Sequence, residues 1–68
     1  MRIRLNGNET DIESGAAVTD LLHELGIAPD TAGVAVALNE TIVPRAEWSS
    51  RRLAPGDAVE VVRAVQGG

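Results

Sequence analysis

The sequence predicts an α+β fold in which one helix packs across one face of a mixed sheet of four to five strands. Three features indicate it: alternating apolar residues near both ends, one stretch with a helical period, and short Gly-, Asn- and Pro-containing segments between them. A chain of 68 residues forms one domain, close to the smallest size that folds without disulfides or metal. We therefore do not expect a large enclosed active site.

The first segment has the pattern of a β-hairpin. Residues 1–5 alternate apolar side chains with arginines, which is the period of a half-buried strand. Asn6-Gly7-Asn8 supplies residues that tolerate the left-handed backbone of a tight turn. Residues 9–12 are therefore expected to return antiparallel to the first strand.

The helix is expected next, because apolar residues recur with a helical period and form one stripe. The stripe consists of Val18, Leu21, Leu22 and Leu25. Gly26 suits a left-handed C-cap and Pro29 prevents the helix from resuming. Its start is expected at Ala17 or at Thr19.

A second hairpin and a final strand complete the pattern. Residues 33–38 are small and apolar on both faces, as expected of a covered strand, and residues 41–43 return after a turn. Residues 45–53 have no clean period and predict a loop with one turn of helix. After the Pro55-Gly56-Asp57 turn, residues 58–65 form the last strand.

Two hairpins around a single crossover helix are the arrangement of the ubiquitin-like β-grasp fold. On the last strand, Val59 and Val61 are expected to face the helix and Val62 to face the opposite side. The predicted core consists of Ile3, Leu5, Ile12, Val18, Leu21, Leu22, Leu25, Val36, Leu38, Ile42, Leu53, Val59 and Val61.

Composition excludes several classes of function. The chain contains no cysteine, so it has no disulfide framework, no thiolate metal ligand and no thiol of its own that carries sulfur. Its net charge of −4 opposes nucleic-acid binding and favours a basic protein partner. No run approaches the ~18 apolar residues of a membrane span, and no apolar signal block opens the chain. We expect a cytoplasmic protein that binds no membrane.

The sequence also lacks the residues of an enzyme. The single histidine, His23, has no cysteine or second histidine as a companion ligand, and its place on the helix predicts a solvated surface side chain. No Ser/His/Asp or Cys/His set is present. We therefore assign no catalytic residue and no metal ligand to this chain.

The last residues carry the chemistry instead. We expect residues 1–65 to form the domain and residues 66–68 a flexible C-terminal tail. In Gln66-Gly67-Gly68 the two glycines lack a Cβ, so this tail is able to thread a channel too narrow for side chains and present a terminal carboxylate. A glycine pair at a chain end is weak evidence alone, and gains weight from the β-grasp pattern before it.

Four segments resemble the sulfur carrier family of thiamin biosynthesis, the ThiS family, over the whole chain. They are Val36-Ala37-Leu38-Asn39, Val43-Pro44-Arg45 with Trp48 close behind, Gly56-Asp57, and Val65-Gln66-Gly67-Gly68. One departure is Ala17, where the family usually has a hydroxyl-bearing residue at the helix start. The loss of that cap is worth about 1 kcal/mol and leaves the tail unaffected.

The resemblance implies a mechanism centred on Gly68. An adenylating, E1-like activating enzyme with ATP and magnesium converts the Gly68 carboxylate to an acyl adenylate, and a sulfur-delivering persulfide protein displaces AMP. The resulting thiocarboxylate is the sulfur donor that thiazole synthase uses for the thiazole ring of thiamin. The carrier itself holds no cofactor.

Partner contacts are expected beside the tail. Val62 lies opposite the core face of the last strand, and we expect Val62, Val65 and the acidic residues near the tail to form the docking surface. Arg45 is a further residue that either steers a partner or pairs within the chain. Trp48 and Pro44 are interpreted as structural, Trp48 as a core plug or edge cover.

Three alternatives remain open. A sulfur carrier of molybdopterin synthesis shares fold and tail, although the Val-Pro-Arg segment with Trp48 fits that family less well. A ubiquitin-like modifier would form isopeptide bonds with target lysines. A non-catalytic β-grasp binding module would be indifferent to the loss of Gly68.

Overall fold

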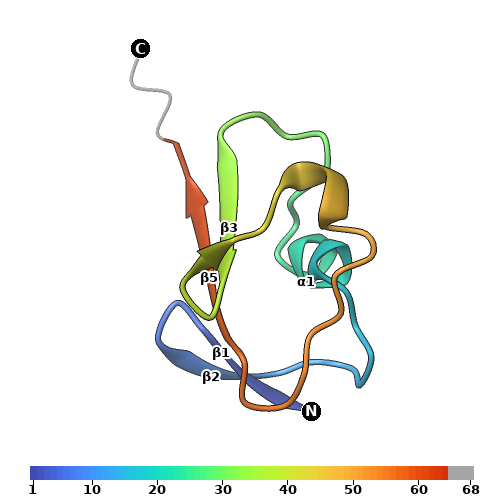
Figure 1. Ribbon diagram of the computed structural model, residues 1–68, viewed down its shortest axis with the longest axis vertical. Helices are drawn as coiled ribbons and strands as arrows, with labels where there is room; N and C mark the ends of the chain where they lie inside the picture. The colour runs from blue at the N-terminus through green and yellow to red at the C-terminus, as the bar shows by residue number, and fades with distance from the viewer. Residues whose placement is uncertain (65–68) are drawn as a thin grey trace.

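Residues 1–64 are described by the computed structural model, and they form a five-stranded sheet with one α-helix on one face (Figure 1). The elements are β1 (Arg2–Leu5), β2 (Asn8–Asp11), α1 (Val18–Glu24), β3 (Val34–Leu38), β4 (Thr41–Ile42), the 3-10 helix η1 (Arg45–Glu47) and β5 (Ala58–Arg63). The strand order is β2-β1-β5-β3-β4. The predicted fold class is confirmed.

The last strand in sequence, β5, lies in the middle of the sheet. It runs parallel to β1, with Arg4 opposite Ala58, and antiparallel to β3, with Val36 opposite Val61. A parallel neighbour requires a crossover, and α1 supplies it between the two hairpins. The strand that leads to the C-terminal residues is therefore supported on both sides.

Both hairpins close through two-residue turns with a left-handed backbone. In the first, Asn6 and Gly7 have φ values of 49° and 84°, and in the second, Asn39 and Glu40 have values of 49° and 71°. Positive φ at both central positions matches the right-handed twist of the strands. The expected Asn-Gly hairpin is confirmed.

Helix α1 begins after Ala17, and its N-terminus is capped without a side-chain hydroxyl group. The Ala17 N–H donates to the Asp20 carboxylate at 2.8 Å. Two further N–H groups of the first turn donate to main-chain carbonyls after η1: Val18 to Arg51 at 3.0 Å and Thr19 to Trp48 at 3.1 Å. The unpaired donors of the helix start are thus satisfied by neighbouring segments, which explains how alanine is tolerated here.

The core lies between α1 and the sheet. Its buried residues are Ile3, Ile12, Ala16, Val18, Leu21, Leu22, Ile27, Val34, Val36, Leu38, Val43, Trp48, Leu53 and Val59, with Leu5 and Val61 partly buried against them. Trp48 is 2% exposed, and its indole N–H donates to the Val43 carbonyl at 2.9 Å. The interpretation of Trp48 as a core plug is confirmed.

The core prediction is wrong for two residues, Ile42 and Leu25, which are exposed. Ile42 is 66% exposed because it pairs with Ala37 on the face of the sheet that α1 does not cover, and Val43 is the buried residue of that segment. Leu25 is 40% exposed because it is the C-cap of α1, and Ile27 fills the core in its place. The covered strand expected at residues 33–38 is likewise covered on one face only.

Among the described residues, no helix is long and apolar enough to cross a membrane. His23 is exposed on α1, as predicted. The strand expected at residues 58–65 is observed as β5, which ends at Arg63, and Val65 lies outside the described residues.

Candidate functional site

The face of the sheet opposite α1 carries an exposed apolar area. The register places Ala35 opposite Val62 and Ala37 opposite Ile42, so these four side chains share that face. Val62 is 59% exposed and Ile42 is 66% exposed. We call Ala35, Ala37, Ile42 and Val62 the open patch.

Charged side chains occupy the other half of the same face. Across β1 and β2, Arg2 lies opposite Asp11 and Arg4 opposite Glu9. The Arg2 Nε donates to the Asp11 carboxylate at 3.1 Å, and Arg4 lies 3.8 Å from Glu9. The Arg2 hydrogen bond and positive charge hold the pKa of Asp11 below its usual value.

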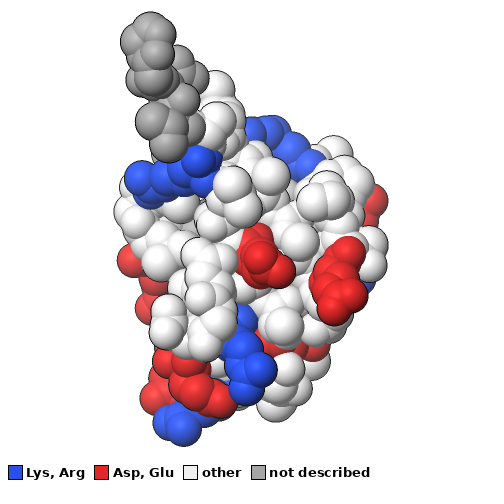
Figure 2. Space-filling view, turned by 90° about the vertical axis from the view of Figure 1, so that its left-hand side faces the viewer, with Lys and Arg blue, Asp and Glu red and all other residues white. Residues whose placement is uncertain are grey.

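Figure 2 views this face directly and shows both halves. Broad uncharged areas are interrupted by single acidic side chains, and side chains of both charges gather at the lower end. Glu60 borders the open patch, because it pairs with Ala37 and so shares the outer face. An exposed apolar area bordered by charge is the composition of a protein contact surface.

The residues expected to carry the chemistry lie outside the described part of the chain. These are Gln66, Gly67 and Gly68, together with Val65 of the expected contact surface. The neighbouring β5 residues are described: Val62 belongs to the open patch, and Ala64 is the last described residue. The patch therefore adjoins the segment that leads to Gly68.

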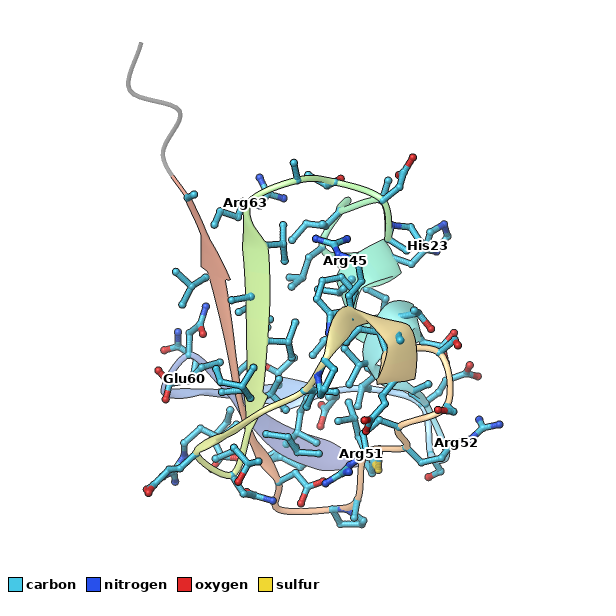
Figure 3. All side chains as sticks on the ribbon, turned by 45° about the horizontal axis from the view of Figure 1, so that its top comes forward. His23, Arg45, Arg51, Arg52, Glu60 and Arg63 are labelled. Carbon is cyan, nitrogen blue, oxygen red and sulfur yellow. The ribbon has the colours of Figure 1, made fainter. Side chains whose placement is uncertain are left out.

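The Arg45 side chain makes its contacts with other residues of the same chain. Its guanidinium donates to the Pro29 carbonyl and to the Thr31 carbonyl, the latter at 2.8 Å, and lies 4.4 Å from the centre of the Trp48 ring. Figure 3 shows Arg45 reaching toward the loop before β3, whereas Glu60 and Arg63 lie along β5. The structure thus gives Arg45 a bracing role between η1 and this loop, by hydrogen bonds and by stacking on an aromatic face.

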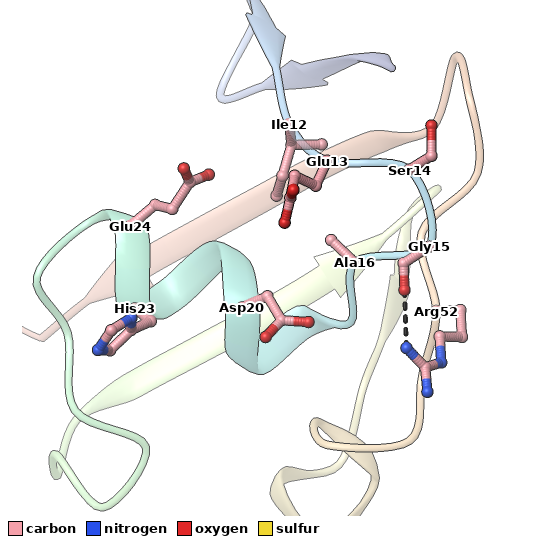
Figure 4. Close-up of a pocket in the computed structure, with 9 residues that line it drawn as sticks. All are labelled: Ile12, Glu13, Ser14, Gly15, Ala16, Asp20, His23, Glu24 and Arg52. Carbon is pink, nitrogen blue, oxygen red and sulfur yellow. Dashed lines mark hydrogen bonds between the residues drawn. The ribbon is translucent and has the colours of Figure 1, made fainter.

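An open hollow of about 390 Å³ lies between α1 and the segment that precedes it, residues 12–16 (Figure 4). The charged groups that line it are Glu13, Asp20, His23, Glu24 and Arg52. Asp20 is engaged with the helix start, and Arg52 donates to the Gly15 carbonyl at 2.8 Å. Within residues 1–64, no three acidic or histidine side chains gather closely enough to hold a metal ion.

Sequence reasoning missed two parts of this site. Ile42 was expected inside because Ile42 and Val43 are adjacent and both apolar, so the residue types did not reveal which one faces inward. The alternation of Val34, Ala35 and Val36 did carry a signal, since the small residue faces outward. The bracing contacts of Arg45 are tertiary and left no local pattern.

The chain is similar to known proteins over nearly its whole length. The model of the ThiS family matches residues 3–68. The sulfur carrier protein ThiS of Escherichia coli is 32% identical over 68 residues, which is 100% of both chains. The sulfur carrier protein ThiS of Thermus thermophilus is 42% identical over 64 residues, covering 94% of this chain and 95% of that protein.

A longer relative and a solved structure extend the comparison. The thiazole synthase of Magnetococcus marinus is 38% identical over 68 residues, and the chain spans only 20% of that protein's length. The crystal structure of the thiamine biosynthesis protein ThiS from Geobacter metallireducens superposes with a TM-score of 0.82 at 30% identity over 100% of both chains. The resemblance carried by the four segments is confirmed, and the chain belongs to the ThiS family.

Proposed function

We propose that this protein is a sulfur carrier whose Gly68 carboxylate is converted to a thiocarboxylate and used as the sulfur donor for the thiazole ring of thiamin. The observation that carries the proposal is the family match, which runs to residue 68 and so includes Gln66-Gly67-Gly68. The full-length alignment with the E. coli carrier supports it.

The chemistry explains why a small domain suffices. A carboxylate is a poor electrophile, so an activating enzyme with ATP and magnesium joins it to AMP and releases pyrophosphate. A persulfide sulfur then attacks the carbonyl carbon and AMP leaves. Cleavage of the sulfur–sulfur bond by a thiol leaves the thiocarboxylate on Gly68. These steps use the partners' catalytic groups and ATP supply, so we place the reaction in the cytoplasm and assign no catalytic residue to this chain.

The surface beside the tail supports docking on these partners. The open patch presents exposed Val62 on β5, the strand that leads to Gly68, and exposed Ile42 on β4, two strands away in the same sheet. Burial of this patch would hold the carrier while the terminal carboxylate enters the partner's site. Val65 is proposed as its extension toward the tail. Arg45 is proposed to support the fold and not to contact the partner.

The name of one relative supports thiazole synthase as the recipient. In the Magnetococcus protein, a segment 38% identical to this chain forms 20% of a protein named thiazole synthase. A carrier joined to its recipient on one chain has a high effective concentration at the recipient's site. We propose that here the two act as separate or linked partners with the same contact.

Intact mass tests the proposal. After incubation with an activating enzyme of this family, ATP, magnesium and a persulfide donor, the chain should gain about 16 Da, because one terminal oxygen is replaced by sulfur. Addition of thiazole synthase and its substrates should return the mass to its starting value. An isopeptide adduct on another protein, with no gain of 16 Da, would instead identify a protein modifier.

Deletion of Gly68 is the matched control. The new terminus stops about 3.3 to 3.6 Å short of the activating site. ATP–pyrophosphate exchange should fall to background while the thermal unfolding midpoint stays unchanged. The substitution Gly67→Val should have the same effect, because a branched side chain obstructs a narrow channel. A truncated chain that exchanges at the wild-type rate would contradict the carrier function.

A further inference from the structure

Two asparagines, one from each hairpin turn, form hydrogen bonds with the backbone of β5. Asn6 and Asn39 have the same φ of 49°, and each is the first residue of its two-residue turn. Each main-chain N–H also donates to a β5 carbonyl: Asn6 to Val59 at 2.9 Å and Asn39 to Ala58 at 2.7 Å. The two residues differ in where along β5 their side chains bind.

The Asn6 side chain binds the part of β5 nearer the tail. Its Oδ1 accepts from the Val61 N–H at 2.9 Å, and its Nδ2 donates to the Val61 carbonyl at 3.3 Å. The strand β1 ends at Leu5, opposite Val59, so these groups of Val61 face the side where no strand continues. The amide of Asn6 therefore takes the place of one further strand residue and extends the ladder along β5.

The Asn39 side chain binds the beginning of β5. Its Oδ1 accepts from the Ala58 N–H at 2.9 Å, and its Nδ2 donates to the Asp57 carboxylate at 3.1 Å. Asp57 in turn accepts from the Ala54 N–H at 2.7 Å. These hydrogen bonds stabilise the turn before β5, at the end of the strand away from the tail.

A contact on the β3 side secures the last described residue. The Ala64 N–H donates to the Gly33 carbonyl at 2.6 Å. A Cβ on Gly33 would lie 3.1 Å from the Ala64 Cβ, and the φ of Gly33 is +78°, so glycine permits this close approach. With Gly33 on one side and Asn6 on the other, the distal part of β5 is held from both edges.

We propose that Asn6 is a positioning residue for activation of Gly68, a role that rests on the proposed function. Residues 65–68 follow Ala64 and span at most about 14 Å. The carboxylate reaches the activating site only if β5 ends at a fixed place relative to the open patch. Release of Val61 from Asn6 would loosen the end of β5, enlarge the volume that Gly68 searches, and lower its effective concentration at that site.

Glycine substitutions isolate the side-chain contribution. Glycine adopts φ near 49° without strain, so Asn6→Gly removes the amide contacts and leaves the turn geometry available. Asn39→Gly is the matched control, because it removes the same number of side-chain hydrogen bonds at the same φ from the other end of β5. Asn6→Asp keeps the acceptor for the Val61 N–H and serves as the conservative variant.

The measurements are ATP–pyrophosphate exchange and amide hydrogen exchange. We expect Asn6→Gly to lower kcat/KM for the carrier at least about fivefold, because the variant loses two side-chain hydrogen bonds and one alone corresponds to a factor of about five. Hydrogen exchange at Val61 should become faster. Asn39→Gly should change kcat/KM less than twofold. It should nevertheless lower the thermal unfolding midpoint by about as much as Asn6→Gly does. Asn6→Asp should recover part of the lost kcat/KM.

The outcomes separate this role from the proposed function. An equal loss of kcat/KM in both glycine variants would assign the effect to stability and overturn the positioning role, as would unchanged kcat/KM in Asn6→Gly. Absence of exchange with the wild-type chain itself would overturn the carrier function and the positioning role with it.

Discussion

The two faces of the sheet use neighbouring residues for opposite purposes. On β5, Val59 is buried under α1, whereas Glu60 and Val62 point to the open side. On β3, Val36 is buried and Ala35 is exposed. A strand alternates its side chains, so one residue step separates the core from the surface. The inner face therefore maintains the fold, and the outer face remains available for a partner at little cost in stability.

The difference also shows how a domain without an enclosed site supports chemistry. Among residues 1–64, the large side chains that are fully buried all pack in the core: Ile3, Val18, Leu21, Leu22, Val36 and Val59. The proposed reaction takes place at Gly68, beyond the core, and requires the domain only as the surface that the partner proteins bind. Stability and activity should consequently respond to different substitutions.

The largest expected loss of stability comes from the inner face. Trp48→Ala removes a 2% exposed ring and leaves the Val43 carbonyl without its indole donor. Its cost should be about 3 to 5 kcal/mol, a large share of the stability of so small a domain. Urea unfolding followed by circular dichroism measures it. Trp48→Phe, which keeps most of the ring, should cost clearly less, and a cost below about 1 kcal/mol for the alanine variant would contradict the core role.

A smaller effect is expected at Arg45, which joins η1 to the loop before β3. Arg45→Met removes two hydrogen bonds to main-chain carbonyls and the stacking on Trp48, and should cost about 1.5 kcal/mol. Affinity for the activating enzyme should stay within twofold when measured below the unfolding transition. Arg52→Met, which removes one such hydrogen bond, should cost less. A tenfold loss of affinity in Arg45→Met would place Arg45 in the partner contact.

These residues show what the sequence could predict. The helical stripe and the two Asn-containing hairpins follow from local periodicity and backbone preference, and they predict the β-grasp fold. Ile42 and Leu25 were misplaced because inward direction depends on register and on where α1 stops, which neighbouring strands decide. The contacts of Asn6 with Val61 join residues 55 positions apart, so no local pattern contains them.

The outer face should tolerate charge with little loss of stability. Val62→Glu places a carboxylate on the open patch. The substitution should lower the free energy of unfolding by only about 0.5 kcal/mol, because Val62 is 59% exposed. Affinity for the activating enzyme should nevertheless fall at least tenfold, since a charge would be buried at the contact. Surface plasmon resonance measures this. Ala28→Glu adds the same charge at an exposed residue after α1 and should leave affinity unchanged; equal losses in both variants would point to general charge repulsion.

The smallest effect is expected from the charged half of the outer face. The Arg2 hydrogen bond and charge lower the pKa of Asp11, so ionised Asp11 is favoured in the folded state. Its contribution to stability is therefore present above the unfolded pKa of about 3.9 and is lost as the pH falls through the lower folded value. Both groups are solvent-exposed, so Asp11→Asn should lower the thermal midpoint only slightly at pH 7, and the difference should vanish near pH 2. In an Arg2→Gln background the pH-dependent effect of the same substitution should be much smaller, because only the weaker attraction of the N-terminal amino group remains. If the difference persisted unchanged at low pH, the side-chain volume or strand preference at position 11 would account for it, and the ion pair would not.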